Sequence, residues 1–275
     1  TSTCTVTFDS DTLTAYLTNL AKTDTTNLAY DGTTDNNLRY IGSSPNNYVT
    51  FNGEQWRIIG VMNNVPDSTG TKASHIKLIR ADSIGAIVWG SNNRNNWSSA
   101  NLQTLLNSGD YWNRTGDYSS TGLTSDAKRV ISNITWNLGG RADTEANAKT
   151  YYTIERGTTV YSGNPTEWAG YVGLMYPSDY GYAVGGSSRS SCLTTNLYDY
   201  NTSCADSDWL YLVDDEWTLL PRSGNSAGVF YVASDGRLYS FGAARISAIR
   251  PVVYLNSDIK KAGGSGTSSD PFTIS

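Results

Sequence analysis

The amino-acid sequence predicts an α+β fold of short strands, few short helices and long irregular loops. Short apolar runs, several of them with alternating polarity, recur along the chain and indicate strands, whereas helical spacing of apolar residues appears only in brief segments. Polar stretches rich in Asn, Thr, Ser and Gly separate these runs and indicate loops. At 275 residues the chain lies near the upper size limit for a single hydrophobic core, so we expect one principal domain.

The first expected element is an amphipathic helix over residues 7–22, with N-caps at residues 9–11. Its apolar stripe recurs at helical spacing and consists of Leu13, Tyr16, Leu17 and Leu20. Residues 23–47 are polar and show no periodicity, which indicates a loop or linker. We therefore divide the chain into residues 1–40, which hold the helix and the polar linker, and residues 41–275, the principal domain. The helix either packs against that domain or serves as a stalk.

The clearest strand signal is a β-hairpin over residues 48–62. Two runs of alternating polarity are separated by Asn52-Gly53, a favourable pair for a tight turn because both central residues need positive φ. A third run at residues 75–80 continues the alternation and extends the expected meander.

Later segments mix brief helices with short strands. Ser98 is an expected cap for a helix at 98–107, a second helix is expected at 125–132, and Pro177 opens a third. A tight turn is expected at Ser234-Asp235-Gly236. The expected strands lie at 171–175, 209–213, 217–220, 228–233, 237–241 and 251–255.

The composition indicates an exported recognition protein rather than a nucleic-acid binder. Charged residues make up only 16% of the chain, and Asn, Ser, Thr, Gly and Tyr supply the polarity, as in adaptable recognition surfaces. The net charge of −5 and the absence of any polybasic stretch argue against nucleic acid, which requires clustered Lys and Arg. No apolar run is long enough to cross a bilayer. We expect an extracellular, cell-surface location with an anchor outside this chain.

The three cysteines give one expected cross-link. Cys192 and Cys204 bracket a polar loop with no His or third Cys nearby to complete a zinc site, so a local disulfide is expected, with two free thiols as the alternative. Cys4 is left over, as a free thiol, an anchor point or a partner in an intermolecular bond.

Few residues point to catalysis. The chain has a single histidine, His75, within an alternating strand, and no Gly-x-Ser-x-Gly elbow stands in a strand-to-helix context. Glycoside hydrolysis uses a pair of carboxylates, but a chain with 25 acidic residues always allows some such pair, so this signal is not specific. We therefore expect no enzyme, no catalytic residues and no cofactor.

A structural Ca²⁺ is the one metal that the sequence allows. Calcium takes six to eight oxygen ligands, and an acidic stretch could supply several of them. The alternative is a solvated acidic loop beside the disulfide. The candidate ligands are Asp206, Asp208, Asp214 and Asp215.

The second half of the chain resembles the C-terminal core of the C-type-lectin-like fold. The resemblance rests on Trp209-Leu, Trp217-Thr-Leu, the run 229–238 and the closing Ile249-Arg-Pro-Val-Val-Tyr-Leu. It is similar to the version shared by sulfatase-modifying-factor-like domains and by the variable proteins of diversity-generating retroelements. Together with the start at residues 47–59 and the tail at 264–272, it also resembles surface proteins of Gram-positive gut bacteria, some with a pilin-like helix. The oxidases among these relatives use a C-terminal cysteine pair, and no cysteine follows Cys204 here.

In the variable proteins, the segment before the closing strand carries the diversified ligand contacts. The resemblance therefore implies a ligand-binding face between Trp217 and Ile249, on a scaffold of buried apolar residues. Arginine and aromatic residues interleave in this segment, and such side chains dominate interface hot spots. The implied ligand-binding residues are Leu220, Arg222, Asn225, Tyr231, Arg237, Tyr239, Phe241 and Arg245.

The expected function is extracellular ligand binding, as an adhesin or receptor-like protein and as a candidate diversified variable protein. The expected partner is a protein or a glycan. One alternative is a pilin-like or fibre subunit that assembles with its own copies through the N-terminal region. The other alternative is a carbohydrate-active enzyme.

Overall fold

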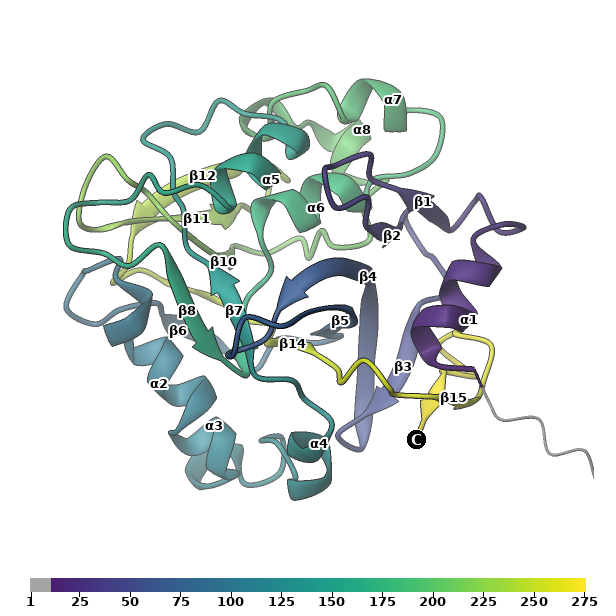
Figure 1. Ribbon diagram of the computed structural model, residues 1–275. Helices are drawn as coiled ribbons and strands as arrows, with labels where there is room; N and C mark the ends of the chain where they lie inside the picture. The colour runs from purple at the N-terminus through teal and green to yellow at the C-terminus, as the bar shows by residue number, and fades with distance from the viewer. Residues whose placement is uncertain (1–10) are drawn as a thin grey trace, which may run out of the picture.

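The computed structural model describes residues 11–275, which fold around two main sheets, one of seven strands and one of five. Two small two-stranded sheets and several short helices complete the fold (Figure 1). In the view of Figure 1, α5, α6, α7 and α8 gather at the top, whereas α2 and α3 lie at the lower left and α4 at the bottom. The predicted α+β class is confirmed.

The seven-stranded sheet has the order β1-β2-β4-β5-β14-β9, with β3 paired to β4. The predicted hairpin is confirmed: Asn52 and Gly53 turn the chain with φ of 58° and 77°. The third run of the meander also pairs as expected, with β5 antiparallel to β4. The strands are β1 (Leu28–Tyr30), β2 (Leu38–Tyr40), β3 (Tyr48–Phe51), β4 (Glu54–Pro66), β5 (Lys72–Arg80), β9 (Val172–Gly173) and β14 (Val252–Tyr254).

The segment before residue 41 shares the core of the large sheet. Helix α1 (Leu13–Leu20) buries Leu13 and Leu17 completely, as its stripe predicts, and Thr12 caps it through a hydrogen bond from the Ala15 N–H. Residues 7–10 of the predicted helix, two of the three expected caps among them, lie outside the described residues, as does Cys4. The third expected cap, Asp11, is described but does not cap the helix. The helix therefore packs against the domain.

The prediction of a polar loop or linker holds for most of residues 23–47, but it misses two short strands in that segment. Strands β1 and β2 lie within it and join the sheet through β4, and Leu28 and Leu38 are buried. Apolar residues are sparse in this segment, so no periodicity marks the strands; β2 pairs with β4, and β1 pairs with β2.

The five-stranded sheet has the order β12-β11-β10-β13-β6 and holds most of the segment singled out for ligand binding. Its β11 and β12 form the predicted hairpin around Ser234-Asp235-Gly236, with Tyr231 opposite Tyr239. The strand predicted at 209–213 is wrong: Trp209 and Leu210 are buried within a turn. The strands are β6 (Ala86–Val88), β10 (Glu216–Pro221), β11 (Gly228–Val232), β12 (Leu238–Gly242) and β13 (Ile246–Ala248).

The remaining elements are short. The predicted helices at 98–107, 125–132 and Pro177 correspond to α2, α4 and α6, but Ala100 rather than Ser98 precedes the first. The α-helices that follow α1 in the described chain are α2 (Asn101–Asn107), α3 (Asp110–Asn113), α4 (Ser125–Arg129), α5 (Ala148–Glu155), α6 (Pro177–Ala183), α7 (Arg189–Cys192) and α8 (Thr202–Ala205). The small sheets pair β7 (Ile134–Asn137) with β8 (Glu167–Gly170), and β15 (Lys261–Gly263) with β16 (Thr273–Ile274).

One large hydrophobic cluster connects the two main sheets. It includes Trp56 from β4 and Leu78 from β5, together with Trp217 from β10 and Phe230 from β11. Because both sheets contribute to it, they share one hydrophobic core. Within residues 11–275, the helices are all too short or too polar to cross a bilayer.

Candidate ligand-binding surface

A row of aromatic rings runs from the core to the surface across the five-stranded sheet. Antiparallel pairing places Trp217 opposite Tyr231 and Tyr231 opposite Tyr239, so the three side chains share one face. The ring centroids are 5.9 Å apart for Trp217 and Tyr231, and 6.2 Å apart for Tyr231 and Tyr239. Trp217 is buried, whereas Tyr239 is half-buried. One end of the row is therefore buried in the core, and the other end is partly exposed to solvent.

Tyr198 extends this row and was not predicted from the sequence. It lies in a 3₁₀ turn (Leu197–Asp199), and its ring meets that of Tyr239 edge to face, with centroids 5.2 Å apart. Tyr198 is 39% exposed. It comes from a segment far from the β11–β12 hairpin in sequence, and only the tertiary fold brings them together.

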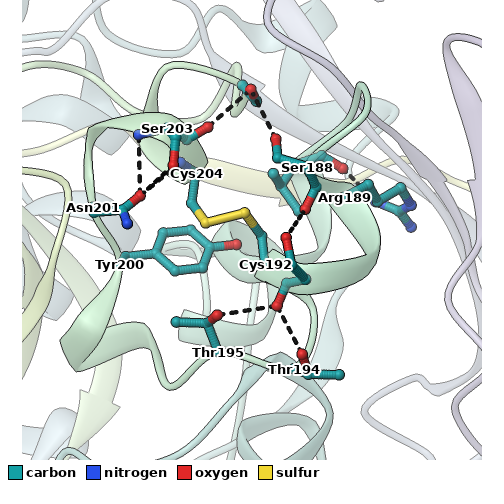
Figure 2. The surroundings of a disulfide bond; sticks show 12 residues. Ser188, Arg189, Cys192, Thr194, Thr195, Tyr200, Asn201, Ser203 and Cys204 are labelled. Atoms are coloured by element: carbon teal, nitrogen blue, oxygen red, sulfur yellow. Dashed lines mark hydrogen bonds between the residues drawn. A yellow bond between two sulfur atoms is a disulfide. The ribbon is translucent and has the colours of Figure 1, made fainter.

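The predicted disulfide fixes the segment that carries Tyr198. Cys192 at the end of α7 and Cys204 in α8 are bonded, with their Cα atoms 5.7 Å apart. Figure 2 shows the bond beside the ring of Tyr200, which is fully buried. The Tyr200 hydroxyl donates to the Gly181 carbonyl at 3.2 Å and ties the loop to α6. The cross-link thus limits the freedom of the loop that presents Tyr198.

Arg245 lies against two aromatic rings. Its guanidinium carbon is 4.7 Å from the ring centroid of Tyr231 and 4.9 Å from that of Phe241. It also donates to the Tyr231 hydroxyl at 3.1 Å and forms an ion pair with Asp215. These contacts hold the guanidinium in one orientation while its side chain stays 30% exposed. Phe241 is 55% exposed although Arg245 covers part of it.

Arg237 is exposed at the end of the same hairpin. It donates to the Tyr239 hydroxyl at 3.4 Å, and that hydroxyl donates to Asp235 at 3.3 Å. We call Tyr198, Arg237, Tyr239, Phe241 and Arg245 the aromatic-arginine surface. Four of its five members were predicted from the sequence.

Two predicted contacts are buried. Leu220 on β10 has no exposed surface, so its place among the ligand-binding residues is wrong. Tyr231 is only 7% exposed, and burial raises the pKa of its hydroxyl. It supports Arg245 and Tyr239 from beneath rather than facing solvent. Alternation along a strand separates the two faces, but what covers each face depends on the rest of the chain.

Arg222 and Asn225 do not join the aromatic-arginine surface. Arg222 donates to Ser240 at 3.3 Å, and Ser240 alternates with Tyr239 and Phe241, which places it on the opposite face of β12. Asn225 accepts the Gly228 N–H at 2.6 Å and thereby closes the turn between β10 and β11. Asn225 is exposed at this turn.

The four acidic candidates for Ca²⁺ do not converge. Asp215 is engaged with Arg245, while Asp206 and Asp214 are exposed. Asp208 is buried and accepts the Leu210 N–H at 2.9 Å, and burial raises the pKa of its carboxyl well above the usual value. Within residues 11–275, groups of three or more His, Cys, Asp and Glu side chains placed to hold a metal ion are absent. The expected calcium ligands therefore do not form a site.

His75 is buried within the large sheet. Its Nδ1 lies 2.8 Å from the Leu255 carbonyl oxygen and 3.4 Å from the Ser132 hydroxyl. The backbone contact orients the ring between β5 and the segment after β14.

Comparison with known proteins adds no assignment: no protein-family model matches the chain, and neither a curated protein nor a solved structure shows significant similarity to it.

Proposed function

We propose that this chain is a non-catalytic ligand-binding protein of the cell exterior, with a C-type-lectin-like fold, and that its aromatic-arginine surface binds a protein partner. The confirmed α+β class and the antiparallel C-terminal strands support the lectin-like part of the proposal. Four members of the surface fall in the segment to which the resemblance assigns variable ligand contacts. The disulfide fits an oxidising, extracellular environment.

The observation that carries the proposal is that the guanidinium of Arg245 is held in place while the neighbouring ring of Phe241 remains exposed. Two rings and Asp215 hold the guanidinium in place, so little side-chain entropy is left to lose on binding. Phe241 keeps 55% of its surface exposed beside it. A preorganised arginine next to an exposed aromatic ring is the composition of a protein–protein hot spot.

The ring geometry favours a protein over a glycan. The planes of Tyr198 and Tyr239 meet at 90°, so the exposed Tyr198 and the half-buried Tyr239 do not form one flat platform for stacking a sugar ring. Their hydroxyls and the two arginines instead offer separate polar contacts around an apolar centre, as in an interface with a polar rim.

The test compares two variants with a matched control. A displayed library of folded extracellular protein domains and a glycan array are each probed with the wild-type chain, Phe241→Ser, Arg245→Ala and Tyr30→Ser. Tyr30 is 49% exposed on β1, in the other main sheet, and controls for the loss of any exposed aromatic. We expect a protein ligand that Tyr30→Ser retains and the other two variants lose. Binding only to glycans, or equal binding by all variants, overturns the proposal.

A further inference from the structure

A buried lysine and a buried aspartate meet between the large sheet and helix α6. Lys77 on β5 has no exposed surface, and Asp179 in the first turn of α6 is 2% exposed. The Lys77 Nζ lies 2.5 Å from Asp179 Oδ2. The two residues are 102 positions apart in the chain, so the tertiary fold alone creates this contact.

Aromatic rings enclose the amine. The Lys77 Nζ lies 4.4 Å from the ring centroid of Tyr176, 5.2 Å from that of Tyr254 and 5.8 Å from that of Trp136. All three rings are buried. Such an enclosure keeps out the water that solvates an ammonium and that would reverse a condensation.

The carboxyl group of Asp179 is polarised on both oxygens. Arg39 donates from Nη1 to Oδ1 at 2.6 Å, and the Tyr176 N–H donates to Oδ2 at 2.9 Å. Arg39 also donates from Nε to Asp31 at 3.0 Å. Burial opposes the ionisation of Asp179, but Lys77 and Arg39 outweigh it and lower the pKa of its carboxyl to about 2, so the pair starts as ammonium and carboxylate.

Burial makes these charges costly. Desolvation lowers the pKa of Lys77 to about 8, although Asp179 opposes the shift. Arg39 pairs with Asp31 as well as with Asp179. If Lys77 and Asp179 lose their charges together, Arg39 therefore keeps Asp31 as its counter-ion. A reaction that neutralises both groups therefore relieves a desolvation cost without creating an unpaired ion.

We propose that Lys77 and Asp179 condense to an intramolecular amide, an isopeptide bond between Nζ and Cγ. One ammonium proton passes along the short contact to Oδ2, and the freed lone pair attacks Cγ. Arg39 stabilises the negative charge that develops on Oδ1. A second proton from Nζ then passes to Oδ2, which leaves as water while the Oδ1 carbonyl re-forms. The ammonium and carboxylate become one amide and one water molecule, with no oxidant or further reactant. Contact in a fixed geometry supplies the effective concentration that free amines and carboxylates lack.

The bond would join β5 to α6 and close a covalent loop through 102 positions of the chain. It lies outside the aromatic-arginine surface, so it does not depend on the proposed ligand. An extracellular protein gains a cross-link that reducing agents cannot open, in addition to the disulfide.

Mass spectrometry of the purified full chain tests the proposal. We expect the denatured, reduced wild type to weigh one water molecule less than its sequence, and a protease digest to contain a branched peptide joining Lys77 to Asp179. Mapping the branch matters because cyclisation at an Asp-Gly pair, such as Asp31-Gly32, also releases water without joining two peptides. Lys77→Arg should restore the full mass, whereas Lys22→Arg, at an exposed lysine, should keep the loss.

The proposal is overturned if the wild type keeps its full mass after prolonged incubation and the Lys77 peptide is recovered unbranched. That outcome identifies the contact as an ion pair only. The wild-type digest decides the question even if Lys77→Arg does not fold.

Discussion

The guanidinium of Arg245 lies 4.9 Å from the ring centroid of Phe241, yet the ring remains 55% exposed. The arginine covers part of the aromatic side chain and is itself held by Asp215. Phe241 can therefore contribute separately to folding and to binding. Its exposed part adds little to the stability of the folded state, but it is the part that a partner would cover. Single substitutions can measure the two contributions.

Replacing Phe241 by Ala should therefore affect binding far more than folding. Loss of a partly exposed cation–π contact costs about 0.5–1 kcal/mol of unfolding free energy. Loss of a hot-spot ring weakens binding by about 2 kcal/mol or more. Urea unfolding and titration with the protein ligand measure the two effects. A large drop in stability instead would identify Phe241 as part of the core.

Removing the disulfide should lower stability without abolishing the fold. The bond between Cys192 and Cys204 closes a loop with a sequence separation of 12, for which the chain-entropy model expects a contribution of about 3 kcal/mol. The double variant Cys192→Ala/Cys204→Ala should show this decrease in urea unfolding. Reduction of the wild type should give the same decrease, whereas reductant should leave the double variant unchanged. Equal midpoints for oxidised and reduced wild type would contradict the prediction.

Breaking the buried ion pair of Arg250 and Glu216 should be strongly destabilising. The two side chains are joined by bonds of 2.8 and 2.7 Å, and they are 3% and 1% exposed. Arg250→Met leaves Glu216 buried without its partner and should cost about 3–5 kcal/mol in denaturant unfolding.

The double variant Arg250→Met/Glu216→Leu provides the control for that prediction. It should recover much of the lost stability, because no uncompensated charge remains. Burial already raises the pKa of Glu216, so the penalty of Arg250→Met should shrink as the pH falls and the carboxyl takes up a proton. A penalty that is the same for the single and double variants would argue against the ionic origin.

Glu155 should make the protein less stable as the pH rises through neutrality. Burial raises its pKa to about 7 from 4.5, while Arg156 and Ser178 offset only part of the shift. Because the folded state holds this proton more tightly, the contribution of Glu155 is fully present below pH 4.5 and is lost as the pH rises through about 7.

The size of the shift corresponds to about 3 kcal/mol. Glu155→Gln should remove this part of the pH dependence. The unfolding free energy of the variant, relative to that of the wild type, should therefore be higher at pH above 7 than near pH 5. Urea unfolding of both proteins at the two pH values measures the difference. Parallel stability curves for the two proteins would show that Glu155 does not titrate in this range.

Local signals account for the parts of the fold that the sequence predicts well. The Asn52-Gly53 turn joins adjacent runs, so neighbouring residues alone determine the β3–β4 hairpin. The same holds for the β11–β12 hairpin and for the cross-link of Cys192 with Cys204. Strands β1 and β2 carry no comparable local signal; they join the sheet because β2 pairs with β4 and β1 pairs with β2.

The candidate surface likewise has residues that the sequence indicates and features that only the tertiary structure determines. The resemblance of the sequence to the lectin-like variable proteins pointed to Arg237, Tyr239, Phe241 and Arg245, and their residue types are local properties that the sequence displays directly. Tertiary structure decided that Leu220 is buried, that Tyr231 lies beneath Arg245 and that Tyr198 joins the row of rings. It also brought Lys77 to Asp179. The physical reason is that burial and contact between distant segments depend on how the sheets pack together, which pairing rules within one segment do not specify.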